Sequence, residues 1–109
     1  MQITRGDSKG LHFQRKRDGQ PILQEAENIY FTVKVNNYTE EAVFQKTIAD
    51  MTFDEDGYYH FTINPEDTNG LNYGDYVYDI EVKIADYTKT ISQGTLSITK
   101  ETTFPANEV

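Results

Sequence analysis

The chain has 109 residues, no cysteine and a formal net charge of −8. That length corresponds to one domain with a single modest core, and the lack of cysteine excludes a disulfide scaffold. The acidic balance disfavours nucleic-acid binding, which needs a basic face, and no apolar run is long enough for a signal peptide or a membrane span.

Apolar and polar residues alternate along the first half of the chain, with turn residues between the alternating runs. Strands are expected at residues 2–5 and 11–16, followed by a turn at 18–21 that contains Gly and Pro. The clearest half-buried strand is predicted over 29–35, with its odd-numbered residues on the apolar face. This pattern is typical of a sheet with one face in a core.

The middle of the chain continues the alternation. A strand is predicted over 42–48, and the Asp-Gly pair within 54–57 predicts a hairpin turn. The returning strand over 58–63 places Tyr59, Phe61 and Ile63 on one face. Residues 64–67 read Asn-Pro-Glu-Asp, which predicts a single capped helical turn.

The longest strand is predicted over 76–84 with its even-numbered residues inward, followed by a turn at 86–87. Residues 89–91 and 95–99 would complete the sheet, with Gly94 at a bulge. We therefore predict an all-β fold, an immunoglobulin-like β-sandwich of about seven strands with one short helical turn. The domain would span residues 1–101, with a loose C-terminal tail over 102–109; an eight-stranded barrel is the structural alternative.

The segment 71–76 reads Leu-Asn-Tyr-Gly-Asp-Tyr and precedes the longest strand. It resembles the tyrosine corner of immunoglobulin-like domains, in which a tyrosine hydroxyl bonds to nearby backbone. Tyr76 is the candidate hydroxyl, Gly74 belongs to the turn, and Leu71 would close the end of the core. The alternative is that Tyr76 is only another inward aromatic residue.

The chain offers little for catalysis. It has no cysteine, and its two histidines, His12 and His60, lie on the polar faces of predicted strands. Asp79 and Glu81 share an outward strand face beside a lysine, so a solvated face explains them better than a carboxylate pair. The acidic residues of 54–57 fit a hairpin turn better than a calcium loop. We therefore predict no enzymatic activity, no metal and no cofactor.

Charge is unevenly placed along the chain. Residues 1–17 contain five basic residues and one acidic residue, about +4, which leaves about −12 for the remainder. Internal pairing or contact with an acidic neighbour would each explain this, and the basic residues 15–17 could also protect an exposed strand edge. Outward tyrosines are typical of cross-strand pairs, of a protein interface or of a sugar-stacking platform. The candidate interface residues are Arg5, Arg15, Lys16, Arg17, Tyr30 and Tyr58.

Several segments, in order, resemble small phage proteins from Gram-positive hosts. They are residues 3–8, 18–21, 29–34 and 44–48, and most specifically Pro-Glu-Asp-Thr at 65–68 followed by Tyr-Gly-Asp-Tyr-Val-Tyr-Asp-Ile at 73–80. The chain is similar to the N-terminal immunoglobulin-like domain of the baseplate upper protein family and to stand-alone prophage tail domains.

The resemblance implies a non-catalytic structural protein of a phage or prophage tail or baseplate. Its partners would be other tail or baseplate proteins, with self-association, and not nucleic acid or a membrane. It would be found in the host cytoplasm during assembly and then in the virion. The alternative function is a carbohydrate-binding or cell-surface recognition module of immunoglobulin-like fold.

Overall fold

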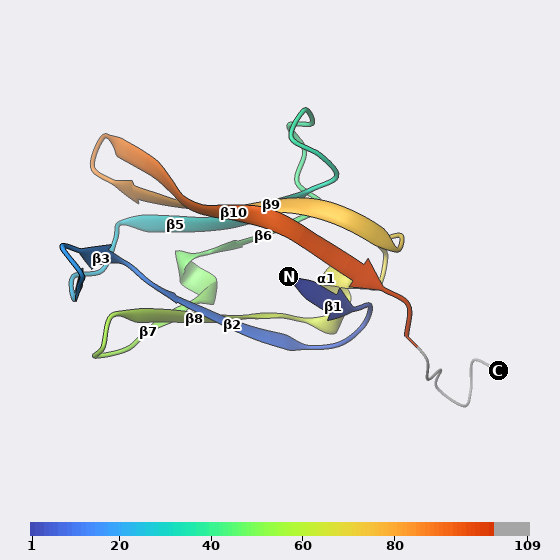
Figure 1. Cartoon of the computed structure of the whole chain (residues 1–109), viewed down its shortest axis with the longest axis horizontal. Coiled ribbons are helices and arrows are strands. Elements are labelled where there is room, and N and C mark those ends of the chain that lie inside the picture. The colour runs from blue at the N-terminus through green and yellow to red at the C-terminus, as the bar shows by residue number, and fades with distance from the viewer. Residues whose placement is uncertain (102–109) are drawn as a thin grey trace.

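Two sheets face each other across an apolar core in the computed structural model, which describes residues 1–101 (Figure 1). The larger sheet has the strand order β1 (Gln2–Thr4), β10 (Tyr87–Thr99), β9 (Gly74–Ile84), β5 (Asn28–Lys34) and β6 (Phe44–Thr47). The smaller sheet has the order β2 (Lys9–Gln14), β8 (Tyr58–Ile63) and β7 (Thr52–Phe53). A separate short hairpin joins β3 (Lys16–Arg17) to β4 (Gln20–Pro21).

The all-β sandwich prediction is confirmed, and the barrel alternative is wrong. A barrel closes its sheet and leaves no edge strand, whereas each of these sheets ends in strands with a neighbour on one side only. The strands outnumber the predicted seven because several are only two residues long. The predicted tail, residues 102–109, lies outside the described residues.

Alternation along β5 places one face of the strand in the core. Ile29, Phe31 and Val33 are fully buried, as predicted. Val35 was expected on the same face but is exposed, because the strand ends at Lys34 and the chain turns there. The predicted strand 42–48 is shorter than expected: β6 covers Phe44–Thr47, and a 3-10 helix, η1 (Ile48–Asp50), follows it.

Aromatic side chains fill the space between the sheets. Phe31 of the larger sheet meets Phe61 of the smaller sheet, with ring centroids 5.0 Å apart. Tyr59 is stacked against Phe13, with ring centroids 5.2 Å apart, and contacts Phe53 from the neighbouring β7. The inward face predicted for residues 58–63 is therefore confirmed, since Tyr59, Phe61 and Ile63 are all buried.

The predicted helical turn is α1 (Pro65–Thr68), and its caps tie it to the rest of the fold. The amide of Asn64 donates to the Asp67 carboxylate at 2.7 Å, which satisfies one end of the helix. Thr68 is fully buried, and its Oγ1 accepts a hydrogen bond from the amide of Gly6 at 2.9 Å. The turn between β1 and β2 is thereby anchored to α1.

Strands β9 and β10 form a long antiparallel hairpin (Figure 1). Their register shifts between Thr90 and Ser92, so the bulge lies at Ile91 and not at the predicted Gly94. A close contact, and not a bulge, favours glycine at position 94, because a Cβ there would lie 3.0 Å from the Tyr78 ring. The shift changes which side chains of β10 face inward, from odd-numbered residues before the bulge to even-numbered residues after it.

Candidate functional site

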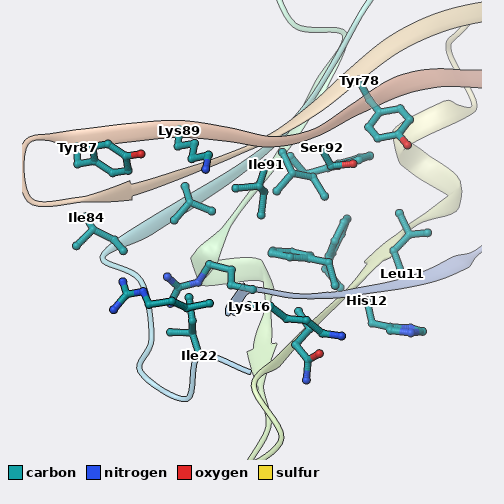
Figure 2. A pocket seen from close by; sticks show the side chains of 18 of the residues that line it. Leu11, His12, Lys16, Ile22, Tyr78, Ile84, Tyr87, Lys89, Ile91 and Ser92 are labelled. Carbon is teal, nitrogen blue, oxygen red and sulfur yellow. The ribbon is translucent and has the colours of Figure 1, made fainter. Parts of the chain in front are cut away.

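A groove of about 740 Å³ opens between the two sheets, between β2 and the hairpin of β9 and β10 (Figure 2). Figure 2 shows Lys89 and Ile91 of β10 pointing from one wall toward Lys16 and Ile22 on the other. The two walls belong to different sheets and share no strand pairing. The groove is therefore a place where the sandwich is not closed.

The floor of the groove is the apolar core itself. Phe31, Phe61, Ile80 and Val82 are buried residues whose side chains also line it. Leu11, Phe13 and Ile22 continue the apolar lining. On the hairpin side the apolar residues stay accessible to solvent, with relative exposures of 42% for Ile84, 63% for Tyr87 and 37% for Ile91. Contiguous exposed apolar surface of this kind is typical of a binding site.

The rim of the groove is basic. Arg15, Lys16 and Arg17 line it from the side of the smaller sheet, and Lys89 lines it from β10. The chain contains 18 acidic residues, yet none of the described residues that line the groove is Asp or Glu. The arginines and lysines that line the groove therefore stand without a carboxylate among the described lining residues, on a protein of strongly negative net charge.

Arg15 departs from its predicted role. We expected it to be an exposed charge at a strand end, but the residue is buried, with 9% relative exposure. Its Nη2 donates to the carbonyl oxygen of Gln24, its Nε has no hydrogen-bond partner, and no ion pair among residues 1–101 involves it. The groove wall thus contains a buried cation that has no carboxylate partner in the described part of the chain, an arrangement that carries a desolvation cost.

Both walls of the groove present strand edges. β2 is the last strand of its sheet on this side. On β10, β1 pairs with Ser97–Thr99, and the ammonium group of Met1 donates to the carbonyl oxygen of Thr95 at 3.0 Å. Residues 87–94 have β9 on one side and no strand on the other among residues 1–101. Within the described part of the chain, alternate backbone amides and carbonyls of these edges have no strand partner, a condition that native proteins usually avoid or use for pairing.

The structure does not bring the other predicted interface residues to this groove. Arg5 lies near the opposite end of β10, where it bonds Glu101 at 3.1 Å and stacks over Tyr73 at 4.4 Å. The hydrogen bond from Arg5 lowers the pKa of Glu101. The positive charge of Arg5 is therefore paired with a carboxylate of the same chain. Tyr30 and Tyr58 lie on the outer faces of the larger and smaller sheets, respectively. The six residues therefore do not form one surface.

The predicted tyrosine corner has a structural role. The hydroxyl of Tyr76 donates to the carbonyl oxygen of Asn72 at 2.8 Å, and the ring is buried. Leu71 packs against the core, and Gly74 has φ +137°, in the region that favours glycine. These contacts fix the entry of the chain into β9 and therefore the direction of the long hairpin.

Both histidines belong to an exposed cluster on the outer face of the smaller sheet. His60 Nε2 lies 2.8 Å from Asp54 Oδ2, and the rings of His12 and His60 are 5.8 Å apart. The hydrogen bond with His60, followed by the one from the Tyr58 amide, lowers the pKa of Asp54. Within residues 1–101 no group of three metal-ligating side chains comes together.

No family model matches this chain, and no curated protein or solved structure is similar to it. Among the described residues, the helices are all too short to cross a bilayer. The groove is therefore interpreted from its own residues. Sequence reasoning missed it, although apolar residues on both sides of the turn at 85–86 were a usable signal.

Proposed function

We propose that this chain is a non-catalytic structural protein of a bacteriophage or prophage tail or baseplate, and that it works by binding other proteins. The observation that supports protein binding is the apolar groove with its basic rim and free strand edges. Protein interfaces combine an apolar centre with polar surroundings, and exposed strand edges accept strands from partners.

The phage assignment is supported by the resemblance of segments 65–68 and 73–80 to baseplate and prophage tail domains. In the fold these segments are α1 and the first part of β9, which lie beside each other in the chain and position the long hairpin. The same resemblance implies no catalytic role. The outward tyrosines lie on two outer sheet faces, in a loop and at the hairpin, and they are Tyr30, Tyr58, Tyr73 and Tyr87. Because they lie apart, they favour a sugar-stacking platform less.

The proposal is tested by mass spectrometry of tail particles purified from an induced lysate of the bacterium that carries the gene. We expect the chain at a fixed ratio to the other tail proteins. A virion role is refuted when intact particles lack it.

A matched pair of variants separates groove binding from incidental association. Ile91→Asp places a charge in the groove, whereas Val35→Asp makes the same change at an exposed apolar residue outside the groove lining. The Ile91→Asp chain should be lost from the particles, and the Val35→Asp chain should be retained. Equal retention of both variants would show that the groove does not hold the chain in the particle.

A further inference from the structure

We infer that the groove binds an extended segment of a partner protein as a strand added to the edge of β10 that has no strand beside it among residues 1–101. Every second side chain of this segment faces the groove, and these groove-facing side chains include both apolar and acidic residues. The inference rests on the proposed function, because it specifies the partner chemistry of the same groove.

The edge of β10 has room for a strand at a defined place. β1 pairs with β10 in parallel at Ser97–Thr99, and Met1, whose ammonium group donates to the carbonyl oxygen of Thr95, lines the groove. Beyond β1, residues 87–94 of β10 pair with β9 on one side, and no strand among residues 1–101 lies on their other side. A partner strand along residues 87–94 would lie in line with β1 and would extend the larger sheet over the groove. Strand addition of this kind supplies affinity through main-chain hydrogen bonds.

The bulge at Ile91 determines which side chains of β10 face the groove. Before it, Tyr87, Lys89 and Ile91 line the groove, whereas after it the buried residues are even-numbered, with Leu96 and Ile98 in the core. Bulges often redirect side chains near binding sites. A strand laid beside residues 87–94 would therefore place every second side chain against the apolar floor.

The charges that line the groove indicate which residues the bound segment contains besides apolar ones. The rim has four basic side chains and no acidic one among the described lining residues. Arg15 is more than nine-tenths buried in the wall, with its Nε unpaired and no carboxylate partner among residues 1–101. A carboxylate from the segment would compensate this charge, and a charge-assisted bond to arginine is stronger than a neutral one. The occupant is thus acidic as well as apolar.

The probe is the peptide acetyl-Thr-Val-Thr-Glu-Thr-Ile-Thr-Glu-amide, in which Val, Ile and Glu share one strand face. It carries a fluorescein label, is titrated with the full chain and is followed by fluorescence anisotropy. We expect saturable binding that weakens with added salt, since Lys16, Arg17 and Lys89 are exposed to solvent. A peptide with lysine in place of every glutamate should not bind. Equal binding of the two peptides would overturn the charge assignment.

Three substitutions locate the site. Arg15→Met should raise the Kd more than about tenfold, because loss of a desolvated charge pair costs several kcal/mol. Lys89→Glu should also weaken binding, whereas Lys100→Glu, an equal charge change outside the groove lining, should leave the Kd within about twofold. Circular dichroism confirms that each variant is folded. If Arg15→Met is unfolded, the comparison of Lys89→Glu with Lys100→Glu decides, and equal affinities of these two variants would overturn the site.

Strand addition is tested separately from side-chain binding. Two peptides are N-methylated at either odd or even positions, so that each loses the amide donors of one edge. We expect one of them to lose binding far more than the other, and hydrogen exchange to slow at residues 87–94 in the complex. Unchanged exchange there, or equal loss with both peptides, would overturn strand addition.

The outcomes also separate this inference from the proposed function. No peptide binding, with the chain still present in tail particles, would overturn the inference and leave the structural role intact. Peptide binding by a chain that is absent from particles would support the groove and refute the virion role. Binding to phosphatidylserine vesicles without peptide binding would assign the groove to a membrane, and salt-sensitive dimerisation that only Lys89→Glu abolishes would assign it to a second copy; either result would overturn the inference.

Discussion

Replacing Tyr59 by phenylalanine removes a single oxygen atom from the core and should destabilise the protein measurably. Tyr59 is almost fully buried between Phe13 and Phe53, and its hydroxyl accepts a hydrogen bond from the amide of Ala26 at 2.9 Å. Ala26 is itself buried in the connection between β4 and β5. The hydroxyl thus holds the connection to the aromatic core.

The size of the destabilisation follows from the Ala26 amide, which loses its hydrogen-bond acceptor in the variant. In the Tyr59→Phe variant the aromatic packing is kept, but a buried N–H loses its only acceptor within the described residues, which costs about 1–3 kcal/mol. For a chain of 109 residues, 1 kcal/mol corresponds to a shift of about 4 °C in Tm. The expected decrease in Tm is therefore about 4–12 °C.

Tyr78→Phe is the matched control, because it makes the same chemical change at a hydroxyl that forms no hydrogen bond within residues 1–101. Urea unfolding followed by far-ultraviolet circular dichroism gives the free energy of unfolding of both variants and of the unmodified chain. We expect Tyr78→Phe to differ from the unmodified chain by less than about 0.5 kcal/mol. An equally small change for Tyr59→Phe would refute the reasoning, since the Ala26 amide would then have another partner.

Three further changes test other parts of the fold. Gly57→Ala should cost more than about 1 kcal/mol, because φ is +87° and the new Cβ would lie 2.9 Å from a main-chain carbonyl oxygen, whereas Gly10→Ala meets open space. Thr68→Val should cost about 1–3 kcal/mol, because a backbone amide loses its acceptor. Asp54→Asn should lower stability at pH 7, and its difference from the unmodified chain should shrink as the pH falls below about 4.

The sign of the pH effect follows from the hydrogen bond with His60. That bond lowers the pKa of Asp54 in the folded state, so its stabilisation is present above the unfolded pKa and is lost as the pH falls through the lower, folded value. Urea unfolding between pH 2.5 and 7 measures this difference. A difference in unfolding free energy between Asp54→Asn and the unmodified chain that stays constant across this pH range would contradict the assigned hydrogen bond. Equal stabilities of Gly57→Ala and Gly10→Ala would contradict the strain assigned to position 57.

Local patterns in the sequence determined the strands and their faces. Alternation along 29–35 predicted the buried face of β5, the Asp-Gly pair predicted the turn before β8, and the Asn-Pro-Glu-Asp segment predicted α1. These features could be predicted because a period of two and the backbone preferences of Gly and Pro act over a few residues. The spacing before Tyr76 likewise indicated a hydroxyl that bonds within four residues of itself.

Only the tertiary structure decided where the sheets separate and what surrounds each charge. Alternation gives the faces of a strand but not its neighbours, so the sequence could not show that β1 covers only the end of the β10 edge. Basic residues 15–17 look alike in sequence, yet the fold buries Arg15 and leaves Lys16 and Arg17 exposed. Pairing between residues far apart in the chain determines these differences, and the groove lies where β10 continues beyond the bond between Met1 and Thr95.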